Sequence, residues 1–136
     1  MVMRRTIRVL MMVCLMVVLA AGAALAASPV ITGTNGEDRI KGTSSVEEIS
    51  GLKGDDEIVD GLGADAVYGN AGVDNLIGYG GDTSVDHFYG GAGGDIIQSR
   101  DIPAVKDYVG CGTGVDRVYA DKADIVSGNR EKVSIR

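Results

Sequence analysis

Acidic residues recur along this chain at a nearly constant interval of nine residues. The interval widens to 12 residues before Asp86 and before Asp107, and it narrows to eight before Asp124. An apolar residue follows two positions after each acid, and glycines cluster before it. A short, fixed period of this kind is typical of a solenoid, in which each repeat packs mainly on its neighbours. The repeated acids are Asp38, Glu47, Asp56, Asp65, Asp74, Asp86, Asp95, Asp107, Asp116 and Asp124.

The repeating unit is a nonapeptide of consensus G-G-x-G-x-D-x-U-x, in which U is apolar. Residues 90–98 are the best copy, whereas residues 42–50 and 81–89 are degenerate copies. The alternative is a disordered segment rich in glycine and aspartate, whose composition is similar. Disorder gives no reason for the apolar residues to keep phase, so we favour a folded repeat. The other good copies are residues 33–41, 51–59, 60–68, 69–77 and 111–119.

The unit has the composition of one turn followed by one short strand. Glycine adopts positive φ at little cost and so marks the turn. In the strand, U faces one way and its neighbours face the other. Two units then complete a coil, and units two apart stack, which places turn 51–56 beside 69–74 and turn 60–65 beside 81–86. We therefore expect an all-β fold, a β-solenoid with a thin core of U side chains.

The turns offer only oxygen atoms as ligands. A glycine-rich turn exposes several carbonyl oxygens, and the aspartate at its end adds a charged oxygen. Such donors suit a hard divalent cation. Calcium accepts six to eight oxygens in flexible geometry, whereas magnesium requires a tighter octahedron. The pattern therefore indicates calcium binding.

From Gly33 to about Asp124 these motifs resemble the repeats-in-toxin (RTX), or haemolysin-type, calcium-binding repeat family. The resemblance implies a right-handed parallel β-roll (β-solenoid) with calcium ions between successive turns, held by the aspartates and by backbone carbonyls. Asp107 and Asp124 are secondary candidates beside an insertion and at the end of the repeats, as is Asp38, and Glu47 stands in a glycine-poor turn. The expected metal-binding residues are Asp38, Gly51, Gly54, Asp56, Gly61, Gly63, Asp65, Gly69, Gly72, Asp74, Asp86, Gly90, Gly91, Gly93, Asp95, Gly112, Gly114 and Asp116.

The tail from Cys111 to Asp121 is similar to a closing repeat of small secreted members of that family. Arg130 occupies the place where those members commonly have a second cysteine. Two interpretations of Cys111 stay open: intermolecular pairing or reactivity, and a harmless thiol left by a lost bridge. Residues 99–106, which contain Pro103, are expected to form a loop at one edge.

Residues 1–26 have the composition of a signal peptide. Arg4, Arg5 and Arg8 precede an apolar run that ends in a small-x-small cleavage motif at residues 24–26. The run is short for a transmembrane anchor, which is the alternative and needs about 20 residues. We expect a secreted, extracellular protein of residues 27–136, a single β-roll domain with a cap at about 124–136, and no transmembrane span in the mature chain.

The mature chain is strongly acidic. Removing the three arginines of the signal peptide from 13 basic residues leaves 10 against 19 acidic residues, a net charge of −9. Such a chain is not expected to bind nucleic acid, which requires a basic surface. It repels itself without cations. Because its core is thin, we expect the apoprotein to be largely unfolded and calcium to drive folding.

The sequence predicts no enzymatic activity. His87 is the one histidine, it lies at an outward strand position, and zinc spacings and nucleophile motifs are missing from the sequence. An alternative function is adhesion or matrix binding on a calcium-rigidified scaffold, with an unidentified extracellular protein or glycan as partner. Tyr68, Tyr89 and Tyr119 share the ninth repeat position, either as a stacking surface or as ordinary strand surface.

Overall fold

The computed structural model describes residues 27–128 and 130–135. The predicted signal peptide lies outside the described residues. The described part of the chain contains β-strands and turns and no helix, so none that could cross a membrane. The strands are β1 (Val30–Thr32), β2 (Arg39–Lys41), β3 (Glu48–Lys53), β4 (Glu57–Val59), β5 (Ala66–Ala71), β6 (Asn75–Ile77), β7 (His87–Ala92), β8 (Ile96–Gln98), β9 (Tyr108–Thr113), β10 (Asp116–Ala120), β11 (Ile125–Ser127) and β12 (Arg130–Ile135).

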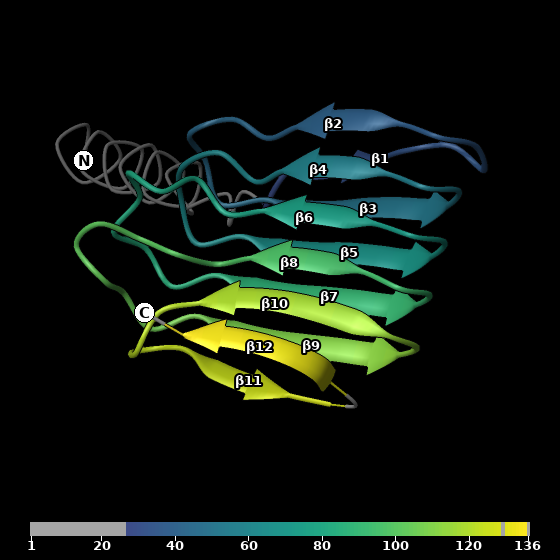
Figure 1. Ribbon diagram of the computed structural model, residues 1–136. Helices are drawn as coiled ribbons and strands as arrows, with labels where there is room; N and C mark the ends of the chain where they lie inside the picture. The colour runs from purple at the N-terminus through teal and green to yellow at the C-terminus, as the bar shows by residue number, and fades with distance from the viewer. Residues whose placement is uncertain (1–26, 129, 136) are drawn as a thin grey trace, which may run out of the picture.

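The strands form two stacked sheets of six strands each (Figure 1). One sheet has the order β1-β3-β5-β7-β9-β11, and the other has the order β12-β10-β8-β6-β4-β2. The chain alternates between the sheets, so that each coil adds one strand to both. All pairings between neighbouring strands are parallel. The fold is therefore an all-β parallel β-roll, as the repeat predicted.

The U residues of stacked units lie in register and form the core. Ile49 pairs with Val67, Val67 with Phe88, and Phe88 with Val109. Full burial of such a side chain contributes about 1.5–3 kcal/mol to the free energy of folding, so the core stabilises the roll through many small contributions. At the two ends of the stack the U side chains are only partly covered. The fully or nearly fully buried U residues are Ile49, Ile58, Val67, Leu76, Phe88, Ile97, Val109 and Val118.

Cys111 also belongs to this core and is fully buried. In this fold its thiol is not exposed to another chain, which favours the second of the two interpretations. The segment from 99 to 107 contains no strand, so the loop expected at 99–106 is confirmed. Residues from 124 onward, predicted to form a cap, contribute β11 and β12, the last strands of the two sheets at that end.

Candidate metal centre

The turns between the sheets form two opposite edges of the roll, and the two edges differ in sequence. We count a turn from the second residue after U to the next repeated acid, so that it includes the ends of some strands. We call one the regular edge, because its five turns counted in this way all have six residues. We call the other the acidic edge, because its turns vary in length and most of them carry two acids. The regular edge comprises residues 33–38, 51–56, 69–74, 90–95 and 111–116, and the acidic edge comprises residues 42–47, 60–65, 78–86, 99–107 and 120–124.

A ladder of hydrogen bonds links the repeated acids along each edge. On the regular edge the backbone N–H of Asp56 donates to Oδ1 of Asp74 at 2.9 Å. On the acidic edge the N–H of Asp65 donates to Oδ1 of Asp86 at 2.8 Å. The same bond recurs at the other steps of both edges. The predicted stacking of turns two units apart is therefore confirmed, because these bonds connect acids 17, 18 or 21 residues apart.

The second carboxylate oxygen, Oδ2, is buried and has no hydrogen-bond partner in most of these aspartates. A buried carboxylate oxygen without a partner is costly, because nothing replaces its hydration. A proton or a cation at this oxygen would remove that cost. The aspartates with a buried Oδ2 of this kind are Asp56, Asp60, Asp65, Asp74, Asp95, Asp101 and Asp116.

On the regular edge the first glycine of the turn leaves room for converging oxygens. A Cβ added at Gly69 would lie 2.4 Å from Oδ2 of Asp74 and 2.6 Å from the carbonyl oxygen of Gly90. Gly90 has the same surroundings, with Oδ2 of Asp95 and the carbonyl oxygen of Cys111 both at 2.5 Å. A carboxylate oxygen and a carbonyl oxygen of the next coil thus approach the same point, as expected for a cation site between turns.

The fourth residue of these turns needs glycine for a different reason. Gly93 has a φ of +147°, and a Cβ there would lie 1.6 Å from the carbonyl oxygen of Gly72 in the preceding coil. Gly72 and Gly114 lie under the same constraint, 1.8 Å from a carbonyl of the preceding coil. The predicted glycines therefore allow the coils to stack closely.

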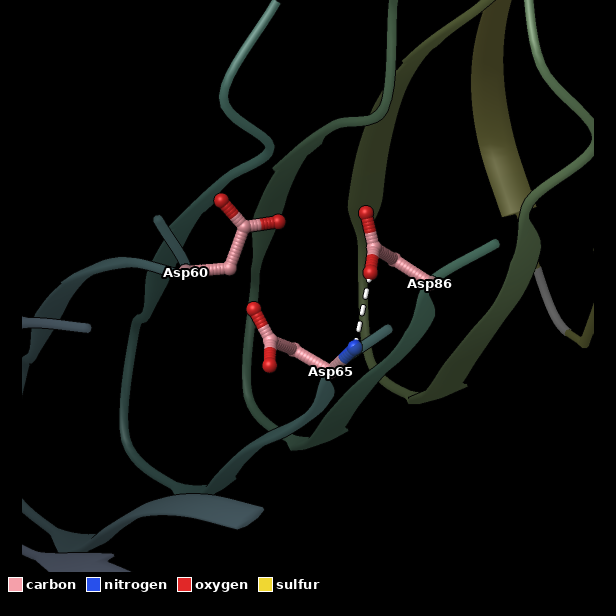
Figure 2. A group of neighbouring side chains, drawn as sticks. All are labelled: Asp60, Asp65 and Asp86. Carbon is pink, nitrogen blue, oxygen red and sulfur yellow. Dashed lines mark hydrogen bonds between the residues drawn. The ribbon is translucent and has the colours of Figure 1, made fainter. Parts of the chain in front are cut away.

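The acidic edge contains a cluster of three buried carboxylates, those of Asp60, Asp65 and Asp86 (Figure 2). One oxygen from each lies within 4.8 Å of the others. Asp60 follows β4, Asp65 precedes β5 and Asp86 precedes β7, so the two turns 60–65 and 78–86 of adjacent coils meet here. Oδ1 of Asp60 accepts the N–H groups of Gly61 at 2.7 Å and Tyr79 at 2.8 Å, which orients the carboxylate.

Burial and mutual repulsion disfavour the charged form of these carboxylates. Burial, together with the charge of Asp86, raises the pKa of both Asp60 and Asp65 to about 7. Burial, together with the charges of Asp107 and Asp82, raises the pKa of Asp86 to about 6. A metal-free cluster therefore holds protons near neutral pH, and a cation would compete for the same oxygens.

On the regular edge burial raises the pKa of the repeated acids in the same way. Burial raises the pKa of Asp95 to about 6, with smaller contributions from the charges of Asp74 and Asp116. Burial also raises the pKa of Asp56 and of Asp74.

Two candidates from the ends of the edges differ from the rest. Oδ2 of Asp38 accepts hydrogen bonds from the N–H of Thr34 at 2.6 Å and from its hydroxyl at 2.9 Å. The carboxylate of Glu47 likewise accepts the N–H of Thr43 at 2.7 Å and its hydroxyl at 2.5 Å. Both acids thus use their oxygens within their own turns, and neither joins the buried cluster.

The consensus overlooked one member of the cluster, Asp60, and three further acids of the acidic edge. Asp60 occupies the first position of its unit, where the consensus has glycine, and that substitution was the available signal. Asp82 and Asp101 lie in the two widened intervals, and Asp121 lies just before the last repeated acid. All four carboxylates are buried, with exposed fractions of 8% or less.

Asp82 differs electrostatically from its neighbours. Burial acts to raise its pKa, but hydrogen bonds from Ser84, Gly63 and Thr83 together lower it below its usual value. Its Oδ2 accepts the N–H of Gly63 at 2.7 Å, and its Oδ1 accepts the N–H groups of Thr83 and Ser84. Asp82 thus anchors the turn that carries Asp86 while remaining charged beside the cluster.

Comparisons with protein-family models, with curated proteins and with solved structures found no match for this chain. Its function is therefore inferred from its own residues and their arrangement.

Proposed function

We propose that this chain is a calcium-binding repeat protein in which cations bind between the stacked turns and stabilise the roll. The observation that carries the proposal is the buried cluster of Asp60, Asp65 and Asp86, with one oxygen from each within 4.8 Å of the others. Oδ2 of Asp60 and Oδ2 of Asp65 have no hydrogen-bond partner. A divalent cation would neutralise charges that the fold otherwise holds together in a dry environment.

The donor set favours calcium over softer metals. The cluster contains carboxylates alone, with neither histidine nor cysteine. Hard oxygen donors suit calcium, magnesium and manganese, and the irregular turns allow the larger coordination number of calcium. On the regular edge, Asp56, Asp74 and Asp95 would act with the carbonyl oxygens of the glycine turns.

The proposal includes an extracellular setting and membership of the RTX family. The signal-peptide composition of residues 1–26 and the nonapeptide consensus support both parts. Extracellular calcium modules typically bind at about 10⁻⁴–10⁻³ M, so the sites would be filled after export. We propose a binding role and no catalytic one.

A calcium titration of the purified protein, starting in EGTA, tests this function. We expect circular dichroism to show a cooperative gain of β-structure with calcium, and isothermal titration calorimetry to show saturable binding. Magnesium at equal concentration is the control and should have little effect. A protein that stays unchanged at about 10 mM calcium, well above the usual extracellular range, would contradict the proposal.

A second candidate function, glycan binding, is favoured by aromatic side chains on the outer face of the sheet that contains β5, β7 and β9. The rings of Tyr68 and Tyr89 stack at 4.9 Å, and those of His87 and Tyr108 stack at 4.8 Å. Tyr89, His87 and Tyr108 also line an open hollow of about 300 Å³ above Gly110.

Aromatic faces beside hydroxyl and imidazole groups suit the stacking of a sugar ring. A glycan array in calcium and in EGTA tests this candidate, with Tyr89→Ala expected to abolish any binding. Binding that persists in Tyr89→Ala would exclude the hollow as the site.

A further inference from the structure

The loop of residues 99–107 interrupts the repeat and places a second acid, Asp101, beside the repeated acid Asp107. We propose that Asp101 and Asp107 form a second cation centre on the acidic edge, built by this inserted loop instead of a glycine turn. This inference rests on the proposed function, because it assigns a further site for the same class of hard divalent cation. It differs from the repeat consensus in that a carboxylate replaces the carbonyl oxygens of glycine.

Asp101 and Asp107 both donate a backbone hydrogen bond to an acid of the turn 120–124 in the next coil, and both side chains are buried. Asp101 is 8% exposed and Asp107 is 1% exposed. The negative charges of the two groups repel each other, since both would be ionised in water. Oδ2 of Asp101 is buried without a hydrogen-bond partner. The pair therefore has a buried oxygen available for a ligand and a charge repulsion that a cation would relieve.

The surrounding groups hold this pair in place without neutralising it. The N–H of Asp86 donates to Oδ1 of Asp107 at 2.9 Å, and the N–H of Asp107 donates to Oδ1 of Asp124 at 3.0 Å. The N–H of Asp101 approaches Oδ2 of Asp121 at 3.4 Å. These contacts come from the coils on both sides, so the pair lies in a row of acids and not in an isolated turn.

The two basic residues of the loop are directed elsewhere. The guanidinium of Arg100 donates to the carbonyl and hydroxyl oxygens of Ser134 at 3.0 and 3.1 Å and lies over the ring of Tyr119. The ammonium of Lys106 lies over the ring of Tyr108, 4.9 Å from its centre. The positive charges of these two side chains therefore lie away from the carboxyl pair, which has no neutralising partner from its own loop.

Burial, followed by repulsion among these acids, raises the pKa of Asp101 to about 6 and that of Asp107 to about 7. The charge of Asp86 contributes to the shifts of both Asp60 and Asp101. The charge of Asp86 therefore acts on both centres. A cation bound at one centre would reduce the negative potential at the other. We expect two ions in a row along this edge.

Equilibrium dialysis of the purified protein against calcium at pH 8 tests the inference. In Asp101→Asn we expect one ion to bind at least tenfold more weakly than in the wild type. Asp60→Asn should weaken a different ion, and the double variant should weaken both. Glu57→Gln makes the same chemical change at an exposed position on β4 and should leave binding unchanged.

Wild-type protein that binds calcium, combined with unchanged binding in Asp101→Asn, would overturn this inference alone. Wild-type protein that binds no calcium would overturn it together with the proposed function. If Asp101→Asn does not fold, the carboxyl ¹³C resonances of the wild type replace it. Calcium should shift those of Asp101 and Asp107, and unshifted resonances at saturation would overturn the second centre.

Discussion

The two edges of this roll join the same strands in different ways. On the regular edge every turn has six residues, ends in one repeated acid and uses glycines to bring carbonyl oxygens close. On the acidic edge the turns range more widely in length, and a second buried acid joins the repeated one. The pairs on that edge are Asp60 with Asp65, Asp82 with Asp86, Asp101 with Asp107 and Asp121 with Asp124.

This difference shows which features the strands require and which the turns can change. Both edges keep the hydrogen bond from the N–H of one repeated acid to the Oδ1 of the next, because that acid immediately precedes a strand. On the regular edge β3, β5, β7 and β9 continue into the turn and stay paired with one another there, which holds its length constant. On the acidic edge nearly all of the rest of the turn lies outside the strands, so its length can vary without shifting the register. The acidic edge uses that freedom to replace carbonyl donors with carboxylates, at the cost of burying more charge.

The largest expected effect concerns close stacking at the regular edge. Gly93→Ala should lower the free energy of unfolding in calcium by on the order of 3 kcal/mol or more. The reason is the positive φ and the carbonyl oxygen of Gly72 at 1.6 Å from the added Cβ. Gly36→Ala is the matched control, since Gly36 has the same turn position but only the hydroxyl of Thr34 nearby, at 3.9 Å. Equal effects in urea denaturation would refute the stacking constraint.

The next prediction compares how the removal of one buried charge changes the stability of the protein on each edge. In EGTA at pH 8, Asp65→Asn should stabilise any folded protein by on the order of 1–3 kcal/mol, because it removes a buried charge whose pKa is about 7. In calcium the same variant should be destabilising, because a ligand is lost. Asp74→Asn on the regular edge should show a smaller gain in EGTA, since fewer acids surround it. Thermal unfolding under both conditions measures the difference, and a loss of stability in EGTA would contradict the electrostatic account.

The pH dependence follows from the raised pKa values on the acidic edge. Asp60 and Asp107 have pKa values of about 7 in the folded state against 3.8 as ordinary carboxyl groups. Protonation therefore favours folding, a contribution that is complete below about pH 3.8 and disappears as the pH rises through 7. Metal-free protein should hold more β-structure at pH 5 than at pH 8, and calcium should remove or reverse this order. Circular dichroism at both pH values tests it, and greater metal-free structure at pH 8 would contradict it.

The smallest effect concerns a single strained residue of the regular edge. Leu52 has a φ of +79°, in the left-handed region that disfavours a side chain. Leu52→Gly should raise the free energy of unfolding by about 1 kcal/mol in calcium. Leu62→Gly on the acidic edge is the control, because Leu62 is also an exposed turn leucine but does not have a positive φ. This variant should be neutral or slightly destabilising. A loss of stability in Leu52→Gly would show that its packing outweighs the strain.

Much of the fold followed from the sequence because the repeat is local and regular. The nine-residue period set the coil, and the phase of residues such as Ile58 and Leu76 identified the core. The meeting of Asp65 and Asp86 was also predictable, since units two apart must stack in a two-sided coil. In contrast, Asp38 is a predicted ligand whose Oδ2 oxygen is already used by Thr34. Its turn is the first on the regular edge in the described part of the chain.

The sequence by itself determined the period, the inward face and the oxygen-only character of the turns, because each depends on neighbouring residues within one unit. Only the tertiary structure decided which acids share a site. Asp60 and Asp101 lie at positions that a consensus treats as glycine or as interruption. Asp60 reaches the cluster because its carboxylate accepts a hydrogen bond from the N–H of Tyr79 in the next turn, and Asp101 lies beside the turn of Asp121. Contacts of that kind depend on the path of the whole loop between two strands, which the residue pattern along the chain does not encode.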